Sequence, residues 1–181
     1  SRDVLVNVNA LGQPVPTARF MGGREMEEIM GGRIVQPLED NLREVLEARV
    51  MAMPSLHPGT GPFPGRRFGW VGDEPEGGVR MAAASFYAAL MGAECLSLVG
   101  AEGPVIVEGA FGGNLAFLRM LATATGRVVR GAGQGAGTGL GAALLAGPLA
   151  VKSAQTLEVM PETDALWTGY VRVWRETVAR W

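Results

Sequence analysis

The chain has 181 residues, and its apolar and charged fractions of 48% and 19% are those of an ordinary globular protein with one sizeable core. Its net charge of −2 excludes the basic surface on which nucleic-acid binding depends, and its single cysteine excludes an internal disulfide. Because neither a signal peptide nor an apolar run of membrane-spanning length is apparent, we expect a cytoplasmic protein with no membrane partner.

The first 30 residues predict a β-hairpin followed by a helix. Valine at every second position gives residues 3–9 the period of a strand, and residues 15–20 read as the returning strand, placed at an edge by its prolines. Gly22 and Gly23 then interrupt the strand, and residues 24–30 are helical in composition. The acidic side chains of this helix are interpreted as a solvated face: Glu25, Glu27 and Glu28.

Residues 36–78 predict a helix and then a long loop. Pro37 suits the first position of the helix, which is expected to end before Pro54. Residues 54–78 hold most of the prolines and glycines of this part of the chain, with aromatic residues between them that favour burial. A loop of this length within a compact domain is usually functional, although its only histidine, His57, is interpreted as solvent-exposed.

The second half of the chain alternates helices and strands. A long, nearly uncharged helix is predicted over residues 78–98, with Cys95 in the core. Residues 104–108 form an apolar strand, and the segment from Asn114 to Thr125 predicts a helix that Gly126 ends. An α/β pattern is completed by a short strand at 127–130, a helix of small residues at 139–146 and an amphipathic helix at 162–181.

Two glycine turns favour a ligand site. In the first, the strand at 104–108 ends in Gly109-Ala110-Phe111-Gly112-Gly113, and Asn114 opens the next helix. Ligands of open α/β sheets bind at the carboxyl ends of the strands, where such a turn exposes bare backbone. In the second, Gly22 and Gly23 precede a helix whose first N–H groups can meet a phosphate. Together the two turns favour a cleft for a nucleotide.

A competing site lies in the glycine-rich stretch that follows. Gly131 to Ala136 match the G-x-G-x-x-G/A dinucleotide fingerprint, and Gly137 to Ala142 match it again. Alternating glycines match by chance, the preceding strand is short, and Glu158 lies too far along the chain to be the acidic residue that holds a ribose. An NAD(P)-binding domain stays open as an alternative, beside the simpler interpretation of a loop that leads into a close-packed helix.

Taken in order, these elements resemble the C-terminal domain of the FGGY carbohydrate kinases, in the branch near rhamnulokinase and xylulokinase. The family's strand, Gly-Gly-x-x-x-Asn turn, apolar helix, glycine and short strand correspond to residues 105–129, and its Gly-Ala-Ala helix corresponds to 139–147. Weaker matches are its strand-Gly-Gly-helix element at 15–30, its proline-rich loop at 53–64 and its aromatic terminal helix around 170–174. The resemblance implies an α/β fold of the actin-like ATPase (ribonuclease H-like) type, a mixed sheet with flanking helices.

The resemblance also implies a site for ATP. In the family the Gly-Gly-x-x-x-Asn turn holds the adenosine, so Gly109, Ala110 and Asn114 are expected to face adenine and ribose, and Gly22 and Gly23 the ribose and phosphates. Ala110 stands where the family usually has its second glycine. The implied ligands are ATP or ADP with Mg²⁺, and a sugar.

The length of family members implies that residues 1–181 are a single nucleotide-binding domain, truncated on its N-terminal side, from the C-terminal half of a two-domain kinase. The catalytic Asp and the Gly-Thr phosphate motif would precede Ser1, and most of the sugar site would lie on the N-terminal domain. No catalytic residue is therefore assigned within the chain, which we expect to be inactive by itself. A noncatalytic actin-like binding module remains an alternative, and a homodimer is left open.

Overall fold

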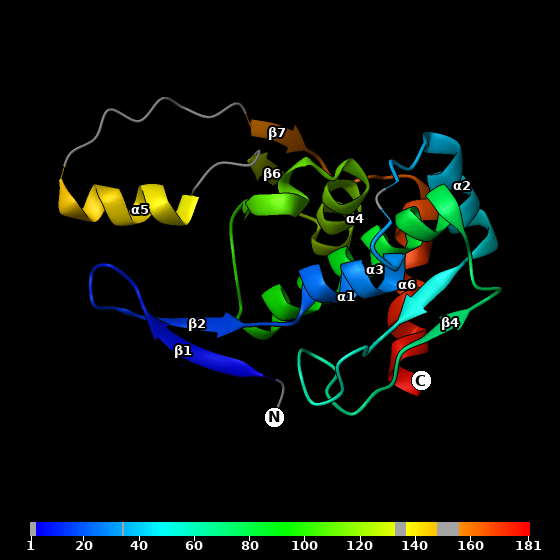
Figure 1. Ribbon diagram of the computed structural model, residues 1–181, viewed down its shortest axis with the longest axis horizontal. Helices are drawn as coiled ribbons and strands as arrows, with labels where there is room; N and C mark the ends of the chain where they lie inside the picture. The colour runs from blue at the N-terminus through cyan, green and yellow to red at the C-terminus, as the bar shows by residue number, and fades with distance from the viewer. Residues whose placement is uncertain (1–2, 34, 133–136, 148–155) are drawn as a thin grey trace.

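The computed structural model describes residues 3–33, 35–132, 137–147 and 156–181 (Figure 1). Helices and strands alternate along most of the chain, which confirms the predicted α/β class. The elements, of which η1 is a 3₁₀-helix, are β1 Val4–Val8, β2 Pro14–Ala18, α1 Gly22–Met30, α2 Glu39–Ala48, β3 Met51–Met53, β4 Gly69–Val71, α3 Gly77–Leu98, β5 Val105–Val107, η1 Gly109–Gly113, α4 Leu115–Thr125, β6 Val129–Ala132, α5 Gly137–Ala146, β7 Thr156–Val159 and α6 Ala165–Arg180.

Helix α3 forms the centre of the core. It packs against α1, α2 and α4, and every residue from Ala82 to Met91 is buried. Its many alanines let the neighbouring helices approach closely, because the distance between packed helices depends on the side chains at the contact. By length and composition α3 could also cross a membrane, but 67% of its most apolar stretch is buried inside the protein. Burial in the core therefore accounts for its apolar sequence.

A three-stranded sheet in the order β5-β6-β7 supports the first glycine turn. β5 and β6 run parallel, with Val105 opposite Val129, and α4 forms the crossover between them. β7 runs antiparallel to β6, so Arg130 lies opposite Glu158, and their side chains form an ion pair at 2.7 Å. A mixed sheet was predicted, but β7 was not, because four residues are too few to show a strand period.

A second antiparallel pair, β3 and β4, corrects the prediction for residues 49–71. The helix was expected to continue almost to Pro54, whereas α2 ends at Ala48 and Arg49 takes a left-handed conformation with φ 53°. Met51–Met53 form β3, are fully buried and pair with Gly69–Val71, which lie within the segment predicted to be a loop. Neither strand is long enough to be recognised from a pattern of alternation.

Helix α6 holds β3 in place through one hydrogen bond to the backbone of the strand and one to the residue just before it. The indole N–H of Trp174 donates to the carbonyl of Ala52 (3.0 Å), and the Tyr170 hydroxyl donates to the carbonyl of Val50 (2.8 Å). Both donors are buried, as is Trp167, so these three aromatic side chains of α6 belong to the core, whereas Trp181 at its end is 39% exposed.

The starts of α2 and α6 lie two and three residues beyond the predicted ones, at Glu39 and Ala165. The side chain of Asn41 accepts the N–H of Leu38 (2.9 Å) at the start of α2. The side chain of Asp164 accepts the N–H of Leu166 (2.6 Å) at the start of α6. Capping by these side chains sets where each helix begins.

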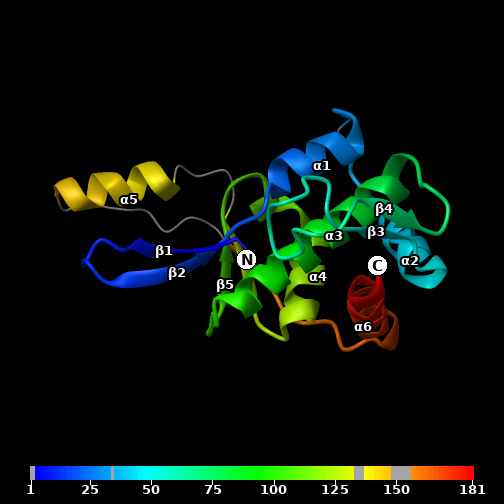
Figure 2. The same ribbon diagram turned by 90° about the horizontal axis from the view of Figure 1, so that it is seen from below.

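The hairpin of β1 and β2 projects from the body of the molecule (Figures 1 and 2). Its strands pair from Val4 with Ala18 to Val8 with Pro14, which confirms the predicted hairpin. At its base, the Asp3 carboxylate pairs with Arg19 (3.0 Å). All five residues of β1 are exposed.

Candidate functional site

The first glycine turn lies at the carboxyl end of β5, as predicted, and is wound into the 3₁₀-helix η1. Gly109 opens it with φ +76°, a left-handed conformation that side chains disfavour. Gly109 and Ala110 are exposed, and a Cβ added at Gly109 would meet no atom within 4 Å. Backbone with open space in front of it is what a bound ligand would require here.

The other side of η1 is in close contact with β6. A Cβ at Gly112 would clash with the carbonyl oxygen of Ala132, and a Cβ at Gly131 would clash with the carbonyl oxygen of Gly112. Two glycines on different elements thus allow backbone to touch backbone. This contact was not predicted, because Gly112 and Gly131 are 19 residues apart and belong to two separate glycine motifs, the turn and the dinucleotide fingerprint.

Asn114 caps α4 and ties it to α3. Its Oδ1 accepts the N–H of Phe117 (3.0 Å), and its Nδ2 donates to the hydroxyl of Ser85 (2.9 Å), which is buried in α3. An amide side chain can make four hydrogen bonds, so one N–H and one lone pair of Asn114 remain for a ligand. The residue therefore positions the turn whether or not it also contacts a nucleotide.

A small cavity of about 60 Å³ lies beside Asn114. One wall is the start of α4, and the other is the segment from Gln36 to Leu42 that leads into α2. The cavity therefore lies between α4 and the segment that leads into α2, next to the last residue of the glycine turn.

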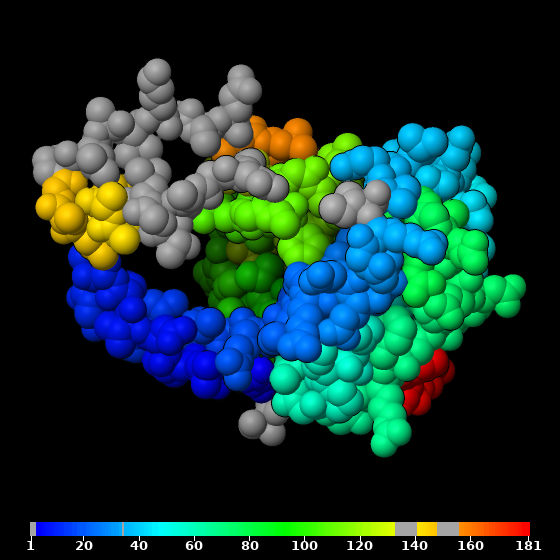
Figure 3. Space-filling model, viewed as in Figure 1, coloured from blue at the N-terminus to red at the C-terminus, as the bar shows by residue number. Residues whose placement is uncertain are grey.

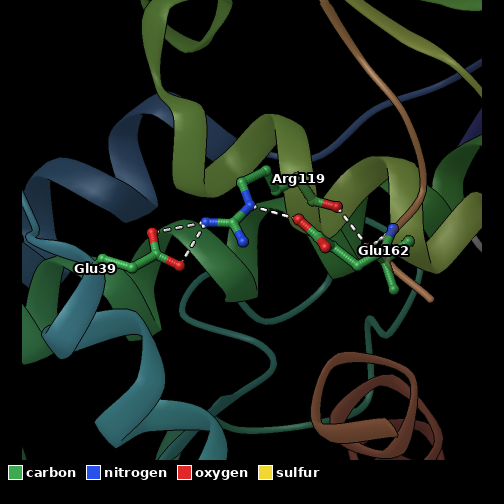
Figure 4. A network of polar contacts seen from close by, with 4 residues as sticks. Glu39, Arg119 and Glu162 are labelled. Carbon is green, nitrogen blue, oxygen red and sulfur yellow. Dashed lines mark hydrogen bonds and ion pairs between the residues drawn. The ribbon is translucent and has the colours of Figure 1, made fainter. Parts of the chain in front are cut away.

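Arg119 of α4 holds the two walls of this cavity together (Figure 4). It is 18% exposed and donates to Glu39 at the start of α2 (2.8 and 3.0 Å) and to Glu162 before α6 (2.6 Å). Its guanidinium carbon also lies 4.4 Å from the centre of the Trp167 ring. Burial lowers the pKa of Arg119, but the hydrogen bonds to both carboxylates outweigh burial and raise the pKa above its usual value. The sequence reading missed this network, whose members are far apart along the chain.

The second glycine turn forms the N-terminus of α1. Gly22 is buried against the ring of Phe20, whereas Gly23 is exposed and has open space where a Cβ would stand. No side chain caps this end of the helix, so its first N–H groups are available to an anion. Both α1 and α4 pack on α3, which places the two predicted turns on one scaffold.

Glu25 corrects the prediction of a solvated acidic face on α1. Glu27 and Glu28 are exposed, but Glu25 is only 1% exposed, and its Oε2 accepts the hydroxyl proton of Tyr87 at 2.6 Å. Burial and the charge of Glu25 raise the pKa of Tyr87 far above its usual value. The sequence did contain a signal for the burial of Glu25. It precedes the buried Ile29 by four residues and so lies on the same face of the helix.

His57 is also less exposed than predicted. Its side chain is 24% exposed, and its Nε2 lies 3.2 Å from Oε1 of Glu28. The neighbouring Ser55 hydroxyl donates to the backbone carbonyl of His57 (3.1 Å) and not to the imidazole. The pair therefore does not form the nucleophile and base of a hydrolase.

The dinucleotide interpretation loses its structural basis. The fingerprint requires its first glycine in the turn between a strand and a helix, but Gly131 is a buried residue within β6, paired with Leu157 of β7. The second match begins inside α5. Residues 133–136 of the first match lie outside the described part of the chain.

No group of three or more His, Cys, Asp or Glu side chains that could hold a metal ion occurs among the described residues. Cys95 is buried, as predicted, and burial raises the pKa of its thiol to about 12. A thiol with so high a pKa is an unreactive core residue.

Comparisons with known proteins agree with one another. The family described as carbohydrate kinase FGGY, C-terminal domain, matches residues 1–156. A carbohydrate kinase from Novosphingobium aromaticivorans is 35% identical and superposes with a TM-score of 0.85, over 99% of this chain and 40% of its own. The search of curated proteins gave no match.

Two more distant structures share the fold. Xylulose kinase from Rhodospirillum rubrum is 13% identical, with a TM-score of 0.67 over 99% of this chain and 42% of its own. Plasmodium falciparum glycerol kinase with ADP is 14% identical, with a TM-score of 0.66 over 98% of this chain and 42% of its own. The chain thus spans about two-fifths of the length of each of these three proteins.

Proposed function

This chain belongs to the FGGY carbohydrate kinases through their C-terminal domain, and from that premise we propose that it is part of an ATP-dependent kinase for a sugar or sugar derivative. In this proposal residues 1–181 are a single domain of the actin-like ATPase (ribonuclease H-like) type. The chain covers 40% of the Novosphingobium kinase, so the catalytic carboxylate and most of the sugar site are assigned to the rest of the protein.

The observation that carries the proposal is the open turn at Gly109. It stands at the carboxyl end of a strand in a parallel pair, with exposed backbone and free space in front of it, which is where α/β folds bind ligands. Gly109, Ala110 and Asn114 would hold the adenosine. The glycerol kinase of the same fold was solved with ADP, which supports a nucleotide as the ligand.

The N-terminus of α1 would face the phosphates. Its uncapped N–H groups and the exposed Gly23 supply backbone donors and the positive end of the helix dipole, both of which favour an anion. The described residues contain no metal cluster, so Mg²⁺ would be held by the phosphates, by water and by groups elsewhere in the kinase.

In phosphoryl transfer the protein acts mainly by positioning and by stabilising charge. ATP with Mg²⁺ supplies the γ-phosphoryl group that a sugar hydroxyl accepts. The residues of this chain bind and orient the adenosine, while Asn114 and Arg119 keep the walls of that site in place. No described residue is assigned as the base.

A titration with a fluorescent ADP analogue tests the nucleotide site. Ala110→Glu adds bulk and negative charge at an exposed position, so binding should weaken at least about tenfold. Ala165→Glu is the matched control, because this residue is also exposed, at the start of α6. Equal affinity for the wild type and both variants would refute the assignment.

A second titration separates a kinase from an NAD(P)-binding domain. Gly133→Val alters the dinucleotide fingerprint and should leave ADP binding unchanged. NADH binding by the wild type that is lost in Gly133→Val would favour the dehydrogenase alternative. Binding of neither nucleotide would favour a noncatalytic module.

Catalysis is tested by sugar-dependent release of ADP. The full-length protein should turn over with at least one sugar, and the 181-residue chain should not. Turnover by the isolated chain would show that its own residues include the catalytic base.

A further inference from the structure

An arginine stands in the first turn of α1, at the helix end assigned above to the phosphates. Arg24 directly follows the exposed Gly23, and its own side chain is 63% exposed. Gly22 and Glu25, on either side of this pair, are buried, so residues 23 and 24 share the outer face of the helix. In the space-filling view the blue segment around the start of α1 borders a hollow in the surface, with green residues across it (Figure 3).

Glu28 holds the guanidinium of Arg24 away from the start of the helix. The Nε–H of Arg24 donates to Oε1 of Glu28, one turn further along α1, at 3.0 Å, and the two terminal nitrogens of the guanidinium donate to no other described residue. Such an exposed pair is weak, because solvent screens it. Helical side chains lean toward the N-terminus, so the guanidinium can also turn back toward Gly23.

His57 is placed to succeed Arg24 as the partner of Glu28. Its Nε2 is buried and has no hydrogen-bond partner among the described residues, although Oε1 of Glu28 lies 3.2 Å away. Because this distance is within hydrogen-bonding range, the bond is missing for want of direction. A carboxylate that turns from Arg24 toward His57 would supply it, and a buried polar atom gains from such a partner.

The charge of the first turn gives Arg24 a second reason to meet a phosphate. Glu25 places a carboxylate in this turn that is only 1% exposed, and a buried charge is screened less than an exposed one. Its negative charge opposes an anion at the helix start, against the favourable helix dipole. The positive charge of the neighbouring Arg24 offsets this repulsion.

We propose that Arg24 is a phosphate-binding residue, which moves from Glu28 to the phosphates of the bound nucleotide while Glu28 turns to His57. The exchange is favourable because hydrogen bonds from a guanidinium to a phosphate are charge-assisted and often bidentate. This inference rests on the proposed function, in which the start of α1 faces the phosphates. Since His57 lies in the proline-rich loop of residues 53–64, nucleotide binding would also fasten this loop to α1.

Titrations of the full-length protein with ADP and with adenosine test the role of Arg24. Arg24→Met keeps most of the side chain and removes its charge, so the Kd for ADP should rise at least about tenfold. Adenosine has no phosphate, and its Kd should change by less than about twofold. Arg172→Met is the matched control, because Arg172 forms the same kind of exposed pair, with Glu176 of α6 at 3.3 Å, and it should leave both constants unchanged. Unchanged ADP binding in Arg24→Met would overturn the proposal.

Glu28→Gln distinguishes a competitor for Arg24 from a structural ion pair. Loss of a structural pair would have the same effect from either side, whereas removal of a competitor should lower the Kd for ADP by about two- to fivefold. In the Arg24→Met background the same change should give no gain. A gain of equal size in both backgrounds would show that Glu28 acts through its own charge and would contradict the release of Arg24.

His57→Phe removes the second partner of Glu28 and should raise the Kd for ADP by about two- to threefold. Unchanged ADP affinity in this variant would contradict the transfer of Glu28 to His57. Its effect on adenosine binding should again be below about twofold.

The two ligands also separate this inference from the function on which it rests. If neither ADP nor adenosine binds the wild type, the proposed nucleotide site is wrong and the inference fails with it. If both bind and Arg24→Met weakens both alike, the nucleotide site stands and only the role of Arg24 is refuted.

Discussion

Replacing Tyr87 by Phe isolates the buried contact between α3 and α1. The variant keeps the aromatic ring and removes only the hydroxyl, so it creates almost no cavity. What it removes is the one hydrogen bond of Glu25, whose Oε2 lies 2.6 Å from that hydroxyl and whose Oε1 has no partner among the described residues. The carboxylate would be left with no donor at a site that is 1% exposed.

A hydrogen bond to a charged group contributes about 1.5–3 kcal/mol, and a buried group left unpaired adds its desolvation cost. We therefore expect Tyr87→Phe to lower the free energy of unfolding by about 2–4 kcal/mol. Urea denaturation followed by circular dichroism measures this difference directly.

Tyr170→Phe is the matched control. Its hydroxyl is also buried but donates to a neutral backbone carbonyl, that of Val50, so the loss should be only about 1 kcal/mol. In the double variant Tyr87→Phe/Glu25→Gln the removal of the charge should recover part of the loss. A change below about 0.5 kcal/mol in Tyr87→Phe, or equal losses at both tyrosines, would refute the reasoning that Glu25 is buried as a charged acceptor.

Three further predictions concern the whole fold and the walls of the site. Burial raises the pKa of Tyr87 and Tyr170, the only tyrosines of the chain. Their contribution is intact below pH 10 and is lost as the pH rises further, so unfolding scans should show stability falling by up to about 1.4 kcal/mol per pH unit for each tyrosine above pH 10. Gly112→Ala forces a Cβ onto the Ala132 carbonyl and should cost about 1–3 kcal/mol in urea denaturation, whereas Gly23→Ala, exposed in a helix, should be neutral or stabilising by about 0.5–1 kcal/mol. Arg119→Met should lower the free energy of unfolding by only about 1–2 kcal/mol, since its partner Glu39 is 70% exposed and the ion pair is screened by solvent. The same variant should weaken ADP binding severalfold. Unchanged affinity would mean that the cavity walls do not position the nucleotide.

The elements with strong local patterns were predictable. The period of two in β1, the long and nearly uncharged sequence of α3 and the glycine after α4 predicted these elements within one or two residues of their observed bounds. The β5–η1–α4 turn was predictable for the same reason, since an apolar run, glycines and a capping asparagine follow one another directly along the chain.

The short elements could not be predicted. β3 owes its place to hydrogen bonds from Trp174 and Tyr170, which lie more than 100 residues away, and β7 needs β6 beside it. The burial of Glu25 depends on Tyr87 of another helix. In each case the partner that decides the structure is distant in sequence, so the residues next to the element do not reveal it.

The sequence by itself therefore determined the α/β class, the family and the position of the glycine turn after β5, because each depends on residue types in local order. Only the tertiary structure decided what supports that turn: the contact of Gly112 with β6, the hydrogen bond from Asn114 to Ser85 and the ion pair of Arg119 with Glu39. These are contacts between elements, and their geometry exists only once the helices have packed around α3.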